Sequence, residues 1–306
     1  MRSRSMLIRF LVGTCLVFGT ITLFADGDPG PIAQVQATLD WLGLSPGIID
    51  GVFGPQTASA VISFQSVRGL QVTGQLDPDT TALLQKADGP RLVSYALQVS
   101  DFQGLAPVPE DWLARSRMKR LDHSTMLERL AERSHVTETL LTKMNPEVNW
   151  NALAPGQVIR LFDFSGSRVA RAERIEVSLD ARTVTAIGPD NQLIARFPCS
   201  IAAKVDKRPT GSFQVTTVAW DPSYTFDPAV YPEAGLRKKL PIPPGPNNPV
   251  GTVWIGLSKP GYGIHGTPDP EDVGRTGSHG CFRLTNWDVE KLARMVKPGI
   301  TVLVRS

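Results

Sequence analysis

Apolar residues in the first third of the chain recur at the spacing of amphipathic helices. They lie on one helical face over residues 35–42 and again over residues 58–64, and glycine and proline residues separate the two stretches. Gly51 permits a tight turn between them, and Thr57 or a neighbouring residue is placed to cap the second helix. The pattern predicts a small helical bundle over residues 32–84.

The middle of the chain has a weaker pattern. Residues 88–120 contain glycine and proline with little periodicity, so we expect a connector there with one short helix. Two helical stretches follow, over residues 127–131 and 136–144, and a Pro-Gly turn then leads into a strand. These elements predict a small α/β unit over residues 121–163.

From Arg174 onward the period shifts toward two, which is typical of strands. Strand candidates with this alternation or a short apolar run lie at residues 175–179, 194–201, 213–217, 252–257 and 300–304. One helix is predicted over residues 287–295, with Asn286 as its potential cap and Pro298-Gly299 at its end. Residues 170–306 are therefore expected to form a mainly β sandwich or barrel with one or two helices.

One segment of this last part is too rich in proline and glycine for a strand. Residues 220–249 also carry three aromatic side chains, Tyr224, Phe226 and Tyr231. Since connections in compact domains have a median of about four to six residues, a segment of this length is typical of a functional loop. We expect it to act as a substrate lid.

Composition and charge narrow the class of protein. The chain has 306 residues, of which 42% are hydrophobic, so two or three globular units are expected. Its 32 basic and 29 acidic residues give a net charge of +3 and are spread along the sequence. Because no block of like charge would follow a phosphate backbone, the sequence argues against nucleic acid as a partner.

The amino-terminal residues have the pattern of a secretory signal over residues 1–25. Arg2, Arg4 and Arg9 precede an uncharged, largely apolar run over residues 10–24. The run is shorter than the roughly 20 apolar residues that span a bilayer, so we expect cleavage and no stable membrane span afterwards. An uncleaved anchor is the alternative. The signal predicts a protein of the periplasm or the cell wall.

Reactive side chains gather near the end of the chain. Of four histidines, His265 and His279 lie in the same glycine-rich segment as Cys281. A thiol becomes nucleophilic as a thiolate, which a nearby imidazole promotes by accepting the proton. Glycines beside a nucleophile let backbone N–H groups approach the reacting carbonyl and form an oxyanion hole. The segment therefore predicts a cysteine nucleophile.

Other interpretations of Cys281 stay open at this point. It could be a buried structural thiol, or it could form a disulfide with Cys199, since Cys15 would leave with the signal. A zinc site could recruit the two histidines, Cys281 and an acid such as Asp269 or Asp272, but the segment lacks paired metal-ligand spacing. We expect no metal and no other cofactor, and we expect Cys199, within an apolar strand pattern, to be buried.

The segment resembles the catalytic signature of the L,D-transpeptidase (YkuD-like) family. The residues that carry the resemblance are Ile264-His265-Gly266-Thr267 and Ser278-His279-Gly280-Cys281-Phe282-Arg283. It extends over residues 170–306 and includes the turn Pro209-Thr210-Gly211 and the approach to a strand at Asn248-Pro249-Val250-Gly251. The resemblance implies a β-rich catalytic domain over residues 170–306.

By position, this resemblance implies that Cys281 is the nucleophile and His265 the general base. The Gly266 carbonyl would orient His265. The backbone N–H groups of Gly280 and Cys281, with help from His279, would stabilise the oxyanion.

Further residues of the same region are expected to contact the substrate. Arg283 would pair with a substrate carboxylate, because its guanidinium fork matches that geometry. We also expect Ser278, Asn286 and Tyr262 to contact the substrate.

The family implies a two-step acyl transfer on peptidoglycan. The thiolate would attack the third residue of a tetrapeptide stem, release the terminal D-alanine, and pass the acyl group to the amine of a second stem, which gives a 3-3 cross-link. With water as acceptor the enzyme would be an L,D-carboxypeptidase, and with a lipoprotein lysine it would be an anchoring enzyme. Carbapenem-type β-lactams would be covalent inhibitors. A non-catalytic wall-binding protein is the alternative of another class.

The two upstream units also resemble wall-binding families. The helical bundle is similar to the helical peptidoglycan-binding domain, which we place at residues 30–87. The residues that match it are Gln36, Leu39, Gly43, Asp50-Gly51, Phe53-Gly54, Thr57, Ala60-Val61, Phe64-Gln65 and Gly69-Leu70. We expect nearly all of them to hold the fold. Asn145-Pro146, Asn151, Leu153 and Pro155-Gly156-Gln157 resemble a LysM domain that lacks the usual opening strand near residues 123–125. Glycan binding and a degenerate spacer are both open for this unit.

Overall fold

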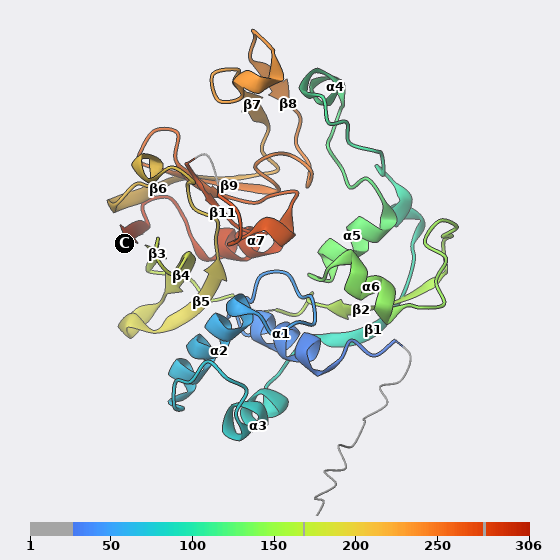
Figure 1. The fold of residues 1–306 in the computed structure, drawn as a ribbon, viewed down its shortest axis with the longest axis vertical. Helices are drawn as coiled ribbons and strands as arrows, with labels where there is room; N and C mark the ends of the chain where they lie inside the picture. The colour runs from blue at the N-terminus through green and yellow to red at the C-terminus, as the bar shows by residue number, and fades with distance from the viewer. Residues whose placement is uncertain (1–26, 168, 278–279) are drawn as a thin grey trace, which may run out of the picture.

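The computed structural model describes residues 27–167, 169–277 and 280–306, which form three units (Figure 1). A helical unit comes first and is blue in the figure, a middle unit of two strands and helices follows in cyan and green, and a sheet-based unit occupies the yellow-to-red end. The predicted signal segment, residues 1–25, lies outside the described residues. We call the three parts the helical unit, the middle unit and the catalytic unit.

Three helices make up the helical unit: α1 Pro31–Trp41, α2 Pro55–Arg68 and α3 Pro78–Lys86. Each helix begins with a proline, whose missing N–H costs no intrahelical bond at that position. Their apolar faces meet in one core that includes Leu39, Val61 and Phe64. This arrangement confirms the predicted helical bundle.

The predicted cap of α2 is wrong. Gly54 precedes the helix without a side-chain cap bond, and Thr57 is buried, where its hydroxyl accepts a hydrogen bond of 3.0 Å from Gln36 Nε2. The same Gln36 amide donates to Asp50 Oδ1 at 2.8 Å and accepts from Gly51 N–H at 2.8 Å. A buried amide that bonds a turn in this way fixes the loop between α1 and α2, so these matching residues hold the fold.

The middle unit is a strand–helix–helix–strand arrangement. Its elements are β1 Arg91–Ala96, α5 Met126–Arg133, α6 Glu138–Met144 and β2 Val158–Asp163, and β1 pairs antiparallel with β2. The prediction of a plain connector over residues 88–120 is therefore wrong, because β1 lies inside it. The partner strand of β1 is far along the chain, so the local pattern around residue 91 carries little sign of the pairing.

An arm of the middle unit, residues 97–122, extends between β1 and α5. It contains the short helix η1 Val99–Phe102, where Phe102 packs against the core of the middle unit, and the short helix α4 Trp112–Arg117, which lies apart from the body of the unit in Figure 1. Asp111 caps α4 by accepting a bond of 2.7 Å from the Ala114 N–H. We refer to residues 97–122 as the arm.

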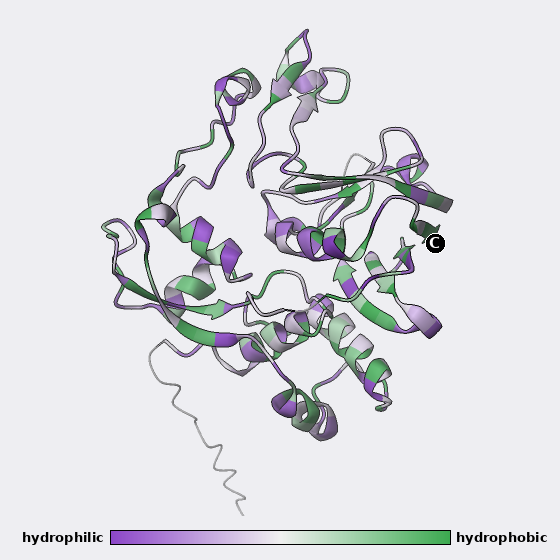
Figure 2. Cartoon of the chain, turned by 180° about the vertical axis from the view of Figure 1, so that it is seen from behind, coloured by the Kyte–Doolittle hydropathy of each residue, from purple (hydrophilic) through white to green (hydrophobic). Residues whose placement is uncertain are grey.

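The catalytic unit is built on an eight-stranded sheet in the order β11-β10-β9-β6-β12-β3-β4-β5. The strands are β3 Arg174–Ser178, β4 Thr183–Ile187, β5 Leu193–Pro198, β6 Gly211–Trp220, β9 Val253–Leu257, β10 Gly263–His265, β11 Phe282–Arg283 and β12 Thr301–Arg305. Figure 2 shows hydrophobic and hydrophilic residues along both the strands and the helices. The five strand predictions are confirmed, and the short strands β4, β10 and β11 are additional.

The helix α7 Asn286–Met295 packs against this sheet and confirms the predicted helix, but its cap differs. Thr285, not Asn286, is the N-cap, and its hydroxyl accepts from the Asp288 N–H at 3.2 Å. Eight residues of α7 are buried, including Trp287 and Lys291. The helix is thus enclosed by neighbouring parts of the chain rather than exposed on one face.

The segment predicted as a lid forms a β-hairpin, β7 Tyr224–Phe226 with β8 Leu240–Ile242. Its aromatic residues pack on the arm: the Trp112 ring lies 4.7 Å from the Phe226 ring and 5.2 Å from the Tyr231 ring. At the base, Arg120 of the arm forms an ion pair with Asp221. Hairpin and arm therefore form one small hydrophobic cluster of their own.

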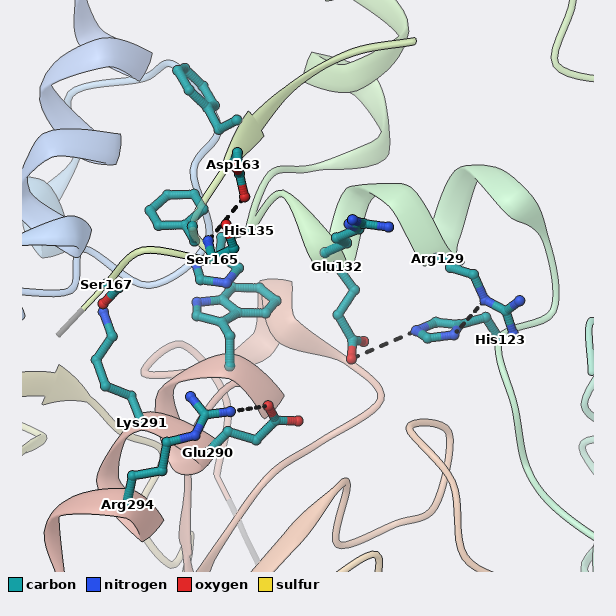
Figure 3. A pocket seen from close by; sticks show the side chains of 14 residues that line it. His123, Arg129, Glu132, His135, Asp163, Ser165, Ser167, Glu290, Lys291 and Arg294 are labelled. Atoms are coloured by element: carbon teal, nitrogen blue, oxygen red, sulfur yellow. Dashed lines mark hydrogen bonds and ion pairs between the residues drawn. The ribbon is translucent and has the colours of Figure 1, made fainter. Parts of the chain in front are cut away.

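A buried ionic contact joins the three units. Asp40 of α1 is 0% exposed and accepts a bond of 3.0 Å from Lys291 Nζ of α7, and its other oxygen lies 2.6 Å from His135 Nδ1 of the middle unit. Burial by itself would raise the pKa of Asp40, but the charges of Lys291 and His135 outweigh it and lower that pKa to about 2. The contact lies beside a pocket of about 690 Å³ between the middle unit and α7 (Figure 3).

Within the described residues, no helix is both long and apolar enough to cross a membrane.

Replacing Asp40 should loosen the whole assembly. Asp40→Ala leaves the buried Lys291 ammonium without its carboxylate, and an unpaired buried charge typically costs about 3–5 kcal/mol. Urea unfolding followed by tryptophan fluorescence measures the change. The control is Asp79→Ala, at an exposed carboxylate in the first turn of α3, which should cost less than about 1 kcal/mol. Equal unfolding free energies for the two variants would contradict the role given to Asp40.

Candidate active site

The site lies at one edge of the large sheet, where three short strands meet. β10 pairs antiparallel with β9 and parallel with β11, and the parallel register sets Ile264 opposite Phe282 and His265 opposite Arg283. Residues directly opposite each other in a sheet share a face, so His265 projects to the same face as Arg283, and Cys281 directly precedes β11. The register therefore places the predicted base opposite Arg283, two residues after the predicted nucleophile.

Cys281 is partly exposed and is a thiol rather than half of a disulfide. Its Sγ lies 3.5 Å from the Gly261 carbonyl. Burial raises the pKa of the Cys281 thiol to about 11, against the lowering effect of the Gly263 backbone N–H. Cys199 is also a thiol and is 0% exposed, and burial raises its pKa to about 12. The alternative of a disulfide between them is wrong, and the prediction that Cys199 is buried is confirmed.

His265 is buried and held from two sides. Its Nδ1 lies 2.6 Å from the Gly266 carbonyl, and its ring stacks on Trp254 with centroids 5.6 Å apart. A carbonyl oxygen only accepts hydrogen bonds, so we assign the ring proton to Nδ1, which leaves Nε2 as an acceptor. Burial, and to a lesser extent the Arg283 charge, lower the pKa of His265 to about 4 despite the Gly266 contact.

The two pKa shifts fix the resting charge of the site. With a thiol pKa near 11 and an imidazole pKa near 4, both groups are neutral around pH 7. A neutral imidazole with a free Nε2 lone pair can accept the thiol proton when an electrophile arrives. The arrangement suits general-base activation of the thiol rather than a preformed thiolate–imidazolium pair.

Arg283 is anchored beside these two groups. Its Nη2 donates to Thr276 Oγ1 at 2.5 Å and lies 3.5 Å from Ser200 Oγ, while its Nε is buried without a hydrogen bond to any described residue. The carboxyl of Asp269 lies within electrostatic reach, and burial and Asp272 raise its pKa while Arg283 and Arg115 oppose that rise. Arg283 thus has donor capacity left over for a ligand.

Tyr262 and Gly280 lie against each other. A Cβ placed on Gly280 would be 3.8 Å from Tyr262 Cε1. Tyr262 also contacts Lys259, whose Nζ lies 5.1 Å from the centre of the Tyr262 ring. Tyr262 therefore packs beside the residue that precedes Cys281. Ser278 and His279, which the sequence also assigns to the site, lie outside the described residues.

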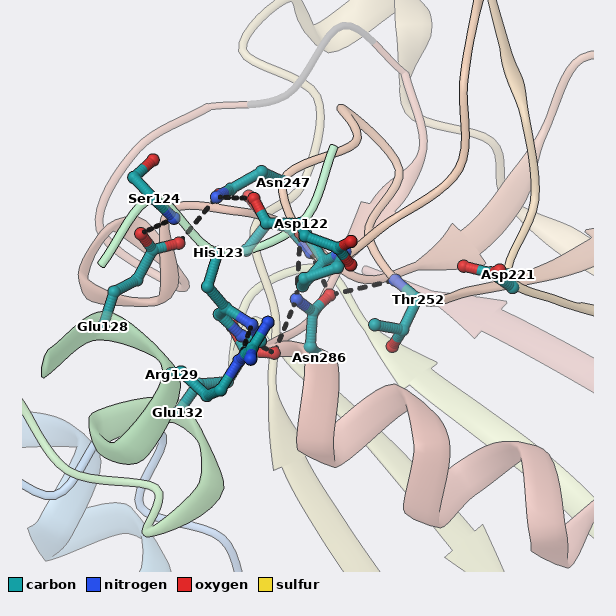
Figure 4. A network of polar contacts seen from close by, with 12 residues as sticks. Asp122, His123, Ser124, Glu128, Arg129, Glu132, Asp221, Asn247, Thr252 and Asn286 are labelled. Atoms are coloured by element: carbon teal, nitrogen blue, oxygen red, sulfur yellow. Dashed lines mark hydrogen bonds and ion pairs between the residues drawn. The ribbon is translucent and has the colours of Figure 1, made fainter. Parts of the chain in front are cut away.

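Asn286 does not have the predicted contact with substrate. It is 1% exposed, and its Oδ1 accepts from the N–H groups of Thr252 at 3.2 Å and Thr267 at 3.1 Å (Figure 4). Its Nδ2 donates to Glu132 Oε1 of α5 at 3.1 Å. The side chain is enclosed because the backbones of Gly251 and Gly266 pack against it. Asn286 ties the loops behind His265 to the middle unit.

Two residues near the site, Trp254 and Arg115, escaped sequence reasoning, whereas Tyr224 was expected only as part of the lid. Trp254 supports the His265 ring, and Tyr224 of the hairpin interacts with Cys281: its pKa is raised by burial first, and also by Tyr231 and Cys281. Arg115 of the arm acts on Asp269. The alternation in β9 marks Trp254 as one of the residues that share a face, but no local signal links the arm to the site, because they belong to different units. Within the described residues, no three His, Cys, Asp or Glu side chains are grouped to hold a metal ion.

Comparison with known proteins identifies the family of this chain. A model of the L,D-transpeptidase catalytic domain matches residues 172–304, and a model of a putative peptidoglycan binding domain matches residues 29–84. Over 178 residues the chain is 30% identical to the putative L,D-transpeptidase YkuD of Bacillus licheniformis. These residues are 58% of this chain and 92% of that protein. The chain belongs to the YkuD family of L,D-transpeptidases. It is a cysteine-dependent acyltransferase that carries a peptidoglycan-binding unit.

Two further L,D-transpeptidases are similar to this chain. The probable L,D-transpeptidase YbiS of Escherichia coli is 32% identical over 111 residues, which are 36% of this chain and 34% of that protein. The crystal structure of an L,D-transpeptidase from Xylanimonas cellulosilytica covers 90% of this chain and 94% of its own, at 17% identity and a TM-score of 0.39.

The rate at which Cys281 is alkylated should show whether Cys281 and His265 are both neutral in the resting enzyme. Since the Cys281 pKa is raised to about 11, alkylation by iodoacetamide should be slow at pH 7. Its rate should rise about tenfold per pH unit as the thiolate fraction grows. Peptide mapping should find the label on Cys281 in the folded protein, and on Cys199 only after unfolding. A rate that is already constant between pH 6 and pH 9 would indicate a preformed thiolate instead.

Proposed function

We propose that Cys281 is the nucleophile of the transpeptidation and that His265 is its base. The observation that carries this proposal is the pairing of β10 with β11, in which His265 lies opposite Arg283 in the strand that directly follows Cys281. The contact of His265 Nδ1 with the Gly266 carbonyl supports it, because a proton held on Nδ1 leaves Nε2 as the ring nitrogen that can accept a proton.

The proposed reaction transfers one acyl group in two steps. His265 Nε2 takes the Cys281 proton as sulfur attacks the carbonyl of the L-centre of the third stem residue. Collapse of the tetrahedral intermediate breaks the amide bond, the imidazolium gives its proton to the leaving amine, and D-alanine departs from a thioester. The amine of a second stem then attacks the thioester, loses its proton to His265, and restores the thiol with a 3-3 cross-link.

The oxyanion of both steps would be stabilised by backbone donors. We assign this part to the N–H groups of Gly280 and Cys281, with help from His279. One such donor is typically worth a factor of about 10² to 10³ in rate. Tyr262 supports the assignment, because its ring packs beside Gly280 and limits where that backbone can lie.

The substrate would be held mainly by charge. Arg283 has a buried Nε without a partner among the described residues, which suits a stem carboxylate. Ser278 and Tyr262 are proposed as neighbouring contacts. We propose the hairpin of residues 220–249 as the lid, because Tyr224 lies close enough to Cys281 for the two to interact electrostatically.

The other two units would bring the enzyme to its substrate. We propose that the helical unit binds the wall, that the middle unit is a LysM-like element that binds glycan or acts as a spacer, and that residues 1–25 direct secretion to the periplasm. The acceptor that we favour is a stem amine, with water or a lipoprotein lysine as alternatives. A non-catalytic wall protein is disfavoured because the thiol and the buried base are both in place.

Loss of the nucleophile should separate catalysis from binding. Cys281→Ala should abolish dimer and tripeptide formation from purified tetrapeptide muropeptides, followed by mass spectrometry, while binding to isolated sacculi persists. His265→Ala should lower the rate by about 10² to 10⁴, the usual worth of a positioned base. The matched control is Cys199→Ala, a thiol in the core of the same unit, which should retain activity. Cross-links above background with Cys281→Ala would contradict the assignment of Cys281 as the nucleophile.

A carbapenem should acylate the same thiol without any stem peptide. Its strained β-lactam carbonyl is an electrophile for the thiol, and ring opening gives a thioester with no leaving group to lose. Incubation with imipenem should therefore add one inhibitor mass per chain, on the peptide that contains Cys281. An unmodified mass in a folded, fully reduced sample would count against a competent nucleophile, and a label on Cys199 would mean that the reactive thiol is misassigned.

A further inference from the structure

The loop that precedes Cys281 lies against the helical unit. Gln56, in the first turn of α2, donates from Nε2 to the Val273 carbonyl at 2.6 Å. Val273 is 1% exposed, so the Gln56 amide takes the place of water at this carbonyl. Next to it, Arg275 Nη2 lies 3.6 Å from Asp50 Oδ2 of the loop between α1 and α2. The helical unit thus contacts residues 273–275 directly.

Two glycines make room for the Gln56 amide. A Cβ on Gly274 would lie 2.4 Å from Gln56 Nε2, and a Cβ on Gly47 would lie 2.7 Å from its Oε1. Both glycines have a positive φ, +75° at Gly274 and +81° at Gly47, which other residues rarely adopt. The amide is therefore enclosed between one backbone of its own unit and one backbone of the catalytic unit, which defines its orientation.

The other side of the same loop is bonded to the strand that carries the site. Ser200 Oγ accepts from the Gly274 N–H at 3.0 Å and donates to the Asp272 carbonyl at 3.2 Å. The backbones of Ser200 and Arg283 exchange hydrogen bonds of 2.9 and 3.0 Å, and Arg283 also bonds Thr276. Arg283 lies in β11, which follows Cys281 directly. A displacement of the loop would be passed to this strand.

We propose that Gln56 is a positioning residue for Cys281. By holding the Val273 carbonyl, it fixes residues 273–276 against β11, so the helical unit acts on the rate of acylation as well as on attachment to the wall. The inference rests on the proposed function of Cys281. Gln56 does not touch the substrate, and it acts through Val273 and the Ser200–Arg283 pair.

The test replaces the side-chain amide nitrogen of Gln56 with an oxygen in the full chain. Gln56→Glu keeps the shape but puts an acceptor against the Val273 carbonyl. The matched control is Gln85→Glu, an exposed glutamine of α3 with the same change of charge. Acylation of Cys281 by imipenem, and kcat and KM for a soluble tetrapeptide muropeptide, are measured beside sacculus binding. Because small misplacements of a reacting group are costly, Gln56→Glu should lower acylation and kcat about tenfold. KM and sacculus binding should stay unchanged, as should every value for the control.

Several outcomes would overturn the proposal. Wild-type acylation and kcat in Gln56→Glu would show that the contact does not position the site. A rise in KM alone, or a loss of sacculus binding alone, would make Gln56 a binding residue. If Gln56→Glu does not fold, Gln56→Met is measured instead, because it keeps the side-chain length and removes the hydrogen-bond donor. The expected results and the results that would contradict the proposal are the same for this variant. Failure of the wild-type protein to react with imipenem would instead contradict the assignment of Cys281.

Discussion

The buried carboxylate of Asp40 is the constraint on which the assembly depends. It is fully enclosed, and its charge is compensated by Lys291 of α7 and His135 of the middle unit, so the helical unit cannot separate without exposing or stranding these groups. The same helix begins at Asn286, whose amide bonds the loops behind His265. Docking of the units and geometry of the site are therefore determined by one element, α7.

The units meet through polar contacts as well as apolar packing, in which Ala33, Ala37 and Ile49 join the core of the middle unit. Arg196 of β5 is 5% exposed and donates to the Ser45 carbonyl at 2.9 Å, and Ser45 Oγ donates to Asp288 Oδ2 at 2.9 Å. Burial, and then the nearby charge of Asp40, raise the pKa of Asp288 above its usual value. Directional bonds of this kind select one relative orientation, which an apolar interface alone would not. A fixed orientation is what a loop such as residues 273–275 requires, since it contacts two units at once.

Part of this structure follows from the sequence and part does not. The strand alternation around Val177 and Val215 and the helix at residues 287–295 are local signals, and the structure bears them out. The strand β1 was missed because its partner lies far along the chain. Asn286 looked like a substrate contact, because its position next to the motif cannot reveal that its amide is enclosed by Gly251 and Gly266.

The chemistry of the site divides in the same way. Cys281 and His265 were proposed from their spacing among glycines, and the contact of His265 with the Gly266 carbonyl was expected from the family resemblance. The charge states of Cys281 and His265 could not be predicted from the sequence, because the shifts of both pKa values come mainly from burial. Gln56 was equally hidden, since its partner Val273 belongs to another unit and the bond goes to a backbone carbonyl that carries no sequence signal.

The central claim is that a neutral thiol at Cys281 becomes a thioester during turnover. Its most direct test is rapid acid quench of the enzyme with a tetrapeptide muropeptide, followed by intact-mass and peptide analysis. The account predicts a transient adduct equal to the muropeptide without its terminal D-alanine, located on Cys281 and removed by hydroxylamine. Steady turnover without such an adduct, or an adduct on a different residue, would contradict it.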